Sequence, residues 1–205
     1  MKFLVPVGGV TEGVYGILTT YKHKGVPAGI VAGLPWAGDN CAFTGFEAAR
    51  FSAWLDSMTP YRSTCLFVAV PDVVGDAAAT LARYVAWSQA MEGWKLGYVA
   101  QDGSEQYDIP PSASALFIGG TTAWKESHAA IEMIQRGQAQ GLHIHIGRVN
   151  WRRRYNMFRV LEGSEQFTCD GTRQRFEGIE RTLAAWKQYE NHQPLVQLGS
   201  SSTPD

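Results

Sequence analysis

The chain has 205 residues, of which 45% are hydrophobic and 18% are charged, and its formal net charge at pH 7 is −1. This size and composition fit one globular domain with a sizeable core and exclude a chain that is disordered throughout. A charge so near zero also excludes a general electrostatic attraction to nucleic acid, so any such binding requires a local basic patch.

The N-terminal segment and the cysteines indicate a reducing compartment. Residues 1–9 contain a proline and two glycines where a signal peptide has an apolar run, and no stretch reaches the ~18 apolar residues of a membrane helix. Cys41, Cys65 and Cys169 are odd in number and far apart, which predicts reduced thiols rather than disulfides or zinc ligands. We therefore expect a cytoplasmic protein with no membrane partner.

Seven short apolar runs typical of strands alternate with six helical stretches. The expected strands are residues 2–7, 28–33, 65–70, 95–100, 115–118, 142–146 and 165–168. The expected helices are residues 12–23, 47–57, 76–92, 124–140, 151–161 and 176–190. This alternation predicts a parallel sheet under helices, in agreement with the run 66–70, which is apolar on both faces.

These elements predict an α/β fold, a compact (β/α) barrel of the TIM type formed by residues 1–192. An eighth strand is not evident, so we expect the barrel to be open or to hold an irregular strand in a loop. An open seam would favour a homodimer that covers it. Residues 193–205, which end in Gly-Ser-Ser-Ser-Thr-Pro-Asp, are expected to be a disordered tail.

Polar and glycine-containing motifs follow the expected strands one after another. In chain order they are Asp39-Asn40-Cys41-Ala42-Phe43, Asp72, Gln101-Asp102-Gly103, Gly119-Gly120 and Asp170. In parallel α/β folds such loops meet at the carboxyl ends of the strands, where ligands bind. The sequence therefore predicts one site that contains all of these motifs.

In this order, and with residues 3–8 as an opening strand, the motifs resemble those of the tRNA-guanine transglycosylases (queuine tRNA-ribosyltransferases). The resemblance is closer to their shorter relatives, often encoded by bacteriophages, which insert 7-deazaguanines into DNA. It implies a pentosyltransferase with Asp170 as nucleophile and Asp39 as general acid/base. It further implies that Asp72, Gln101 and the backbone of Gly119 and Gly120 contact the base.

The chemistry of base exchange suits these residue types. Exchange at an anomeric carbon with retention needs a carboxylate nucleophile, and a second carboxylate to manage the protons of the two bases. A third carboxylate can accept hydrogen bonds from the amino and imino edge of guanine. Glycines allow close approach of the backbone to a planar base, on which Trp36, Phe43 or Tyr107 could stack.

A set of basic residues is expected to contact phosphates at the rim of the site. These residues are Lys125, Arg148, Arg152, Arg153 and Arg154. Taken alone, the three consecutive arginines are more typical of a solvated helix start, and their place on the expected active face makes contact with phosphates an equally good interpretation.

One departure from the family affects the choice of polynucleotide. The tRNA enzymes carry a zinc site of three clustered cysteines and one histidine, which the dispersed cysteines of this shorter chain cannot supply. The resemblance thus favours DNA over tRNA, a 7-deazaguanine such as preQ0 as the incoming base, and no metal or cofactor. If a phage encodes the protein, it would act in the host cytoplasm.

Two other functions stay open. His143 and His145 share one face of a strand and, with Asp170, could serve a metal-dependent barrel hydrolase, although histidines satisfied by hydrogen bonds beneath the site are the more common case. A barrel that binds a nucleobase or nucleotide without catalysis is the other alternative. The presence of both Asp39 and Asp170 argues against it.

Overall fold

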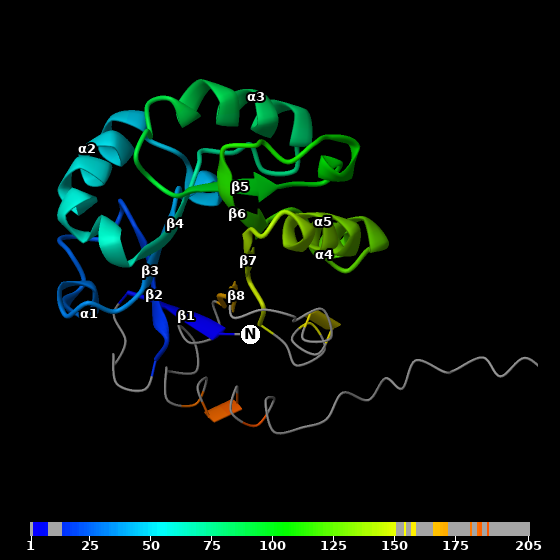
Figure 1. The fold of residues 1–205 in the computed structure, drawn as a ribbon. Coiled ribbons are helices and arrows are strands. Elements are labelled where there is room, and N and C mark those ends of the chain that lie inside the picture. The colour runs from blue at the N-terminus through cyan, green and yellow to red at the C-terminus, as the bar shows by residue number, and fades with distance from the viewer. Residues whose placement is uncertain are drawn as a thin grey trace, which may run out of the picture.

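The computed structural model describes residues 2–7, 14–150, 154, 157–158, 166–171, 181, 184–185 and 188. Within them, eight parallel strands form a closed barrel in the order β1 to β8 (Figure 1). The strands are β1 (Lys2–Pro6), β2 (Gly16–Thr20), β3 (Trp36–Asp39), β4 (Cys65–Ala69), β5 (Leu96–Ala100), β6 (Ala113–Ile118), β7 (His143–Ile146) and β8 (Phe167–Cys169). Pairing of Lys2 with Thr168 and of Phe3 with Cys169 closes the ring. The predicted α/β barrel is confirmed.

Helices surround the strands in Figure 1. They are α1 (Ala28–Val31), α2 (Ala48–Met58), α3 (Ala77–Ser88), α4 (Thr122–Lys125) and α5 (His128–Ala139). Three short 3₁₀ helices are η1 (Ala42–Thr44), η2 (Thr59–Thr64) and η3 (Ser104–Gln106). Side chains of Asp76, Thr121 and Ser127 cap α3, α4 and α5 by accepting hydrogen bonds from backbone amides of the first turn. Among the described residues, none of the helices has the length and apolar character to span a membrane.

Three predicted elements are wrong. Residues 12–23 were expected to be a helix, but β2 lies there, because its short apolar run ending in two β-branched threonines fits a strand better. Residues 28–33 were expected to be a strand and instead contain α1, which Pro27 precedes and Gly33, at φ +89°, follows. The predicted helix 124–140 is two helices, since Ser127 starts α5 anew.

Two strands of the barrel, β2 and β3, are not among those predicted, and β3 is a four-residue run that the sequence pattern leaves in a loop because Gly38 interrupts it. With it the barrel closes, so the described strands leave no open seam, and the reason for expecting a homodimer no longer applies. Parts of the predicted helices 151–161 and 176–190 are described, and those residues are helical. The rest of these segments and the tail 193–205 lie outside the described residues.

Side chains alternate between two cores, as strand geometry requires. Those that point inward fill the barrel and include Leu4, Leu18, Phe67, Val99 and Phe117. Those that point outward pack under the helices, and Trp36 is the largest of them. None of the three cysteines, all of which are described, forms a disulfide, as predicted.

Candidate active site

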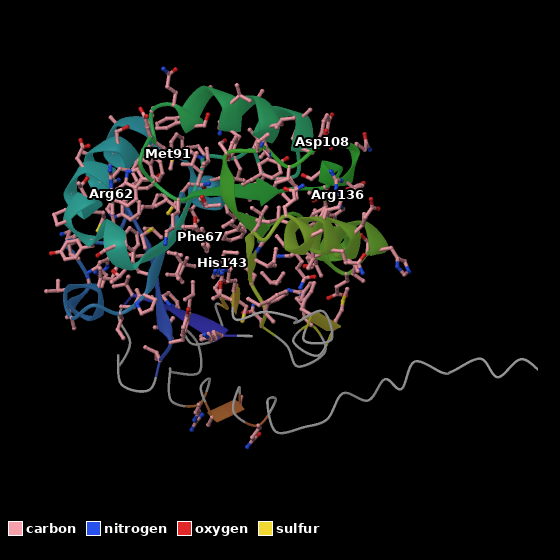
Figure 2. The ribbon with its side chains drawn as sticks, in the orientation of Figure 1. Arg62, Phe67, Met91, Asp108, Arg136 and His143 are labelled. Carbon is pink, nitrogen blue, oxygen red and sulfur yellow. The ribbon has the colours of Figure 1, made fainter. Side chains whose placement is uncertain are left out.

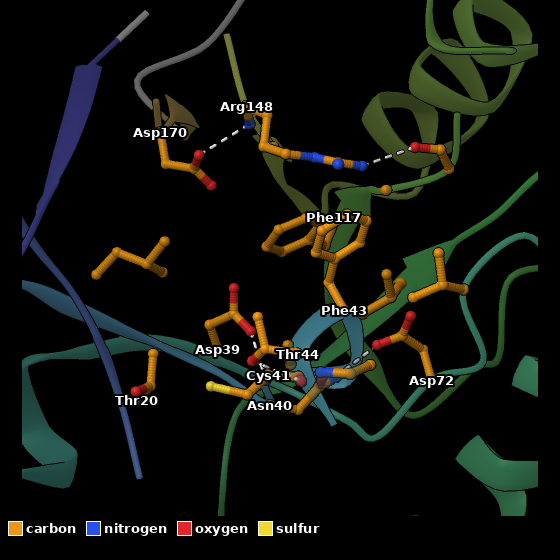
Figure 3. Close-up of a pocket in the computed structure, with 18 of the residues that line it drawn as sticks. Thr20, Asp39, Asn40, Cys41, Phe43, Thr44, Asp72, Phe117, Arg148 and Asp170 are labelled. Atoms are coloured by element: carbon orange, nitrogen blue, oxygen red, sulfur yellow. Dashed lines mark hydrogen bonds between the residues drawn. The ribbon is translucent and has the colours of Figure 1, made fainter. Parts of the chain in front are cut away.

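A cavity of about 320 Å³ opens at the carboxyl ends of the strands (Figure 3). Its floor is the apolar upper layer of the barrel interior, with Leu18, Ala69, Val99 and Phe117. Its walls come from the loops that follow the strands. Nine residues predicted for the site line it: Asp39, Phe43, Asp72, Gln101, Gly119, Gly120, Lys125, Arg148 and Asp170. The structure thus brings the dispersed motifs together.

Asp170 directly follows β8 and is held on both carboxylate oxygens. Its Oδ1 accepts a hydrogen bond from the backbone amide of Arg148 at 2.8 Å, and its Oδ2 lies 3.2 Å from Nε2 of His145. The side chain is nearly buried yet lines the cavity. A carboxylate anchored in this way is oriented for attack on a bound ligand.

Asp39 ends β3 and points into the same part of the cavity as Asp170 (Figure 3). Its Oδ1 accepts a 2.6 Å hydrogen bond from the amide of Cys41, which has a left-handed backbone (φ +59°). Burial raises the pKa of Asp39 to about 6, the Cys41 amide opposes this, and the negative charges of Asp170 and Asp72 add to it. A carboxyl group with this pKa can give and take protons near neutral pH.

Asp72 lies on the opposite side of the cavity within a dense amide network. Its Oδ1 accepts from Nδ2 of Asn40 at 2.7 Å, and its Oδ2 accepts from Nε2 of Gln101 at 2.6 Å. Burial raises the pKa of Asp72, and the two amide donors oppose that rise. Gln101 is in turn fixed through Oε1, which accepts from the amides of Gly75 and Gly120.

The glycine pair after β6 supplies space rather than hydrogen-bond donors. The amide of Gly119 donates to the carbonyl of Ala100, and that of Gly120 donates to Gln101. A Cβ on Gly119 would lie 2.9 Å from Nε2 of Gln101, and one on Gly120, at φ +70°, would lie 2.7 Å from the ring of Trp124. Any side chain here would therefore displace the network that holds Asp72.

The structure places the residues of the predicted basic rim in different environments. Arg148 lies at the cavity, donates to the carbonyl of Gly120 at 3.0 Å, and places its guanidinium 4.9 Å from the ring centre of Phe43. Arg154 is instead buried, where it bonds the carbonyl of Arg148 and pairs with Glu126. Its guanidinium is thus used within the fold, so it is not part of an exposed rim. Arg152 and Arg153 lie outside the described residues.

Lys125 is also no rim residue, since its side chain is only 1% exposed. The residue lines the cavity, and its Nζ donates to the carbonyl of Gly147 at 3.0 Å. Burial lowers the pKa of Lys125 to about 7, and the positive charges of Arg148 and Arg154 add to this. The cavity thus holds an amine that titrates near neutrality.

Of the three aromatic residues expected to stack on a base, only Phe43 lines the cavity. Its ring is 71% exposed at the mouth. Trp36 points away from the cavity, is fully buried, and donates from Nε1 to the carbonyl of Tyr61, so its proposed stacking role is wrong. Tyr107 does not line the cavity either.

His143 and His145 point into the barrel beneath the cavity and are hydrogen bonded, as the simpler of the two interpretations predicts. Both rings contact the hydroxyl of Thr168, and His145 also contacts Asp170. Among the described residues, no three histidine, cysteine or acidic side chains group in a way that could hold a metal ion. Nε2 of His143 and both ring nitrogens of His145 are therefore already hydrogen bonded to protein groups rather than open to a metal ion.

Sequence reasoning missed three polar residues at the site. Asn40 is buried and orients Asp72, but its motif drew attention only to its neighbour Asp39. Thr20, the last residue of β2, and Lys22, which follows the strand, line the cavity, and Lys22 donates from Nζ to the carbonyl and hydroxyl of Thr44. They were missed because β2 was assigned to a helix, and a correct strand there would have revealed them.

Neither the scan against models of protein families nor the search of curated proteins finds a match to this chain. Function must therefore be inferred from the cavity itself.

Proposed function

We propose that the protein is a base-exchange transglycosylase that replaces guanine in a polynucleotide, DNA in preference to tRNA, with a 7-deazaguanine. The observation that carries this proposal is one cavity that presents three aspartates in three different environments. Asp170 is anchored at both oxygens, Asp39 titrates near neutrality, and Asp72 is fixed by two amides.

The first half of the reaction forms a covalent intermediate. A carboxylate oxygen of Asp170 attacks C1′ as the bond from C1′ to N9 of guanine breaks, and the electron pair of that bond goes to the departing base. Asp39, protonated in a substantial fraction of molecules near its pKa of about 6, gives its proton to that base.

The second half restores the enzyme. Asp39, now ionised, takes the N9 proton of the incoming 7-deazaguanine, whose N9 attacks C1′ as the ester bond to Asp170 breaks. Two inversions at C1′ retain the configuration of the sugar, and no oxidant or reductant is needed.

Recognition of both bases falls to Asp72 and its neighbours. Each oxygen of an ionised carboxylate has two lone pairs, so after the bonds from Asn40 and Gln101 each oxygen of Asp72 can accept one more. The N1–H and amino group of guanine, which a 7-deazaguanine shares, present two donors side by side. Phe43 at the mouth stacks on a base that has left the duplex.

The test is mass spectrometry of nucleosides after the protein is incubated with DNA, or with tRNA, and with labelled guanine or preQ0. We expect label in DNA nucleosides and none with Asp170→Asn. Label only in tRNA would overturn the choice of DNA. Base binding without exchange in either polynucleotide would identify a binding protein instead.

A further inference from the structure

A chain of four hydrogen-bonded side chains runs from Asp170 into the barrel. Nε2 of His145 lies 3.2 Å from Oδ2 of Asp170, and Nδ1 of His145 lies 2.9 Å from Oγ1 of Thr168. That hydroxyl also lies 2.8 Å from Nε2 of His143. His145 and Thr168 are fully buried, and His143 nearly so.

The surroundings of the chain are aromatic. The centre of the Phe117 ring lies 4.6 Å from the centre of the His145 ring. The centre of the Phe67 ring lies 5.2 Å from that of His145 and 5.5 Å from that of His143. In Figure 2, Phe67 and His143 are both labelled within the ring of strands. Polar groups in so apolar a place are stable only when hydrogen bonded, so proton positions within the chain are strongly constrained.

Counting donors fixes the direction of the chain. An ionised Asp170 can only accept, so Nε2 of His145 must carry a proton. In a neutral ring Nδ1 is then an acceptor, which requires the one hydroxyl proton of Thr168 to point toward His145. The hydroxyl oxygen in turn accepts a hydrogen bond from Nε2–H of His143. Every donor in the chain thus points toward Asp170.

We propose that His145 is a positioning residue for the nucleophile, and that Thr168 and His143 hold its ring in the Nε2–H tautomer. This inference rests on the proposed role of Asp170 in base exchange. His145 restrains Oδ2 while the Arg148 amide restrains Oδ1, so the carboxylate is fixed on both sides. A neutral donor also leaves the carboxylate more reactive than a full ion pair would.

The state of His143 supports a neutral chain. Burial lowers the pKa of His143 to about 3, and the positive charges of Lys95 and Lys2 add to this. His143 therefore stays uncharged at any pH at which the protein would work, and it can serve as the fixed donor at the inner end.

The hydrogen-bonded chain can be tested by removing the Thr168 hydroxyl, since valine has nearly the shape of threonine. Thr168→Val deletes the hydroxyl that holds the His145 ring, so the hydrogen bond from His145 to the charged Asp170 is weakened, and kcat for base exchange should fall about 10- to 100-fold, as for loss of one hydrogen bond to a charged group, with KM little changed. Thr168→Ser keeps the hydroxyl and should restore most of the rate. Thr19→Val is the matched control, because Oγ1 of buried Thr19 has no hydrogen-bond partner among the described residues.

A second measurement does not depend on activity. Nitrogen NMR of histidine-labelled protein should show His145 with its proton on Nε2 and none on Nδ1, and Thr168→Val should shift the Nδ1 resonance because that nitrogen loses its hydrogen bond. A proton on Nδ1 of the wild-type ring, as the other tautomer or as imidazolium, would overturn the inference. A loss of kcat in Thr19→Val equal to that in Thr168→Val would show that the Thr168 hydroxyl has only a structural role, and this result would also overturn the inference. If wild-type protein exchanges no base, the proposed function fails, while the ring NMR still decides the tautomer.

Discussion

The two sides of the cavity are built differently. Around Asp72, both carboxylate oxygens are hydrogen bonded to the side-chain amides of Asn40 and Gln101, and this network joins the loops that follow β3, β4, β5 and β6. On the other side, Asp39 accepts a hydrogen bond from the backbone amide of Cys41, and burial raises its pKa to about 6. The side proposed for base recognition is thus held rigid, whereas the carboxylate proposed to exchange protons is less stabilised in its charged form.

This difference predicts that substitutions on the two sides act on different kinetic constants. Changes at Asp39 and Asp170 should lower kcat, and changes on the Asp72 side should raise KM. Asp76→Asn is a suitable control for all the aspartate variants, since it removes a charge from an exposed helix cap that asparagine serves equally well.

Asp170→Asn should have the largest effect. A neutral amide is nearly isosteric but cannot form the glycosyl ester, so kcat should fall by about 10⁴- to 10⁶-fold, as for loss of other covalent nucleophiles. Binding of guanine, measured by calorimetry, should be largely retained. Normal exchange by this variant would remove the transglycosylase proposal.

Asp39→Asn should lower kcat by about 10²- to 10⁴-fold through loss of proton transfer. In wild-type protein, release of guanine in a single turnover needs protonated Asp39, so its rate should fall as pH rises through about 6. The variant should lose this dependence. The range from pH 5 to pH 8 extends roughly one unit or more to each side of this pKa. A wild-type rate of guanine release that stays constant over that range would contradict the role of Asp39 as acid.

The same substitution should stabilise the fold. Because folding raises the pKa of Asp39, its contribution to stability is full at low pH and is lost as pH rises toward about 6. Above that pH, Asp39→Asn should therefore increase the free energy of unfolding, by about 1–3 kcal/mol. The asparagine carbonyl can still accept from the Cys41 amide. Denaturant melts at pH 3 and pH 8 should show the gain at pH 8 and almost none at pH 3, with an intermediate gain at pH 5, which lies between the unfolded and folded pKa values of Asp39.

Asp72→Asn should act mainly on recognition. One acceptor becomes a donor that faces the amide of Asn40 or Gln101, and the guanine edge loses its partner. We expect KM for the incoming base to rise about 10- to 100-fold, with a smaller change in kcat. A loss confined to kcat would place Asp72 with the catalytic pair instead.

Phe43→Ala should have the smallest effect. A base stacked on an aromatic ring gains roughly 1–3 kcal/mol, so affinity for single-stranded DNA should fall about 5- to 100-fold. Phe43 is mostly exposed, so the melting temperature should not change. Unchanged affinity would show that the ring only packs against Arg148.

The sequence allowed the fold class and the gathering of the site residues to be predicted, because polar residues after buried parallel strands meet at one end of a barrel. It did not reveal β2 and β3, whose runs of five and four residues are too short for periodicity to decide. Burial of Arg154 and the outward direction of Trp36 depend on packing between distant segments, which one sequence does not display.

Trapping of the covalent intermediate tests the central claim most directly. The protein is incubated with single-stranded DNA and a poor incoming base, denatured, and digested, and the peptide that contains Asp170 is examined by mass spectrometry. We predict a glycosyl adduct on Asp170 in the wild-type protein and none in Asp170→Asn. An adduct that persists in Asp170→Asn, or one found on another residue, would contradict the account.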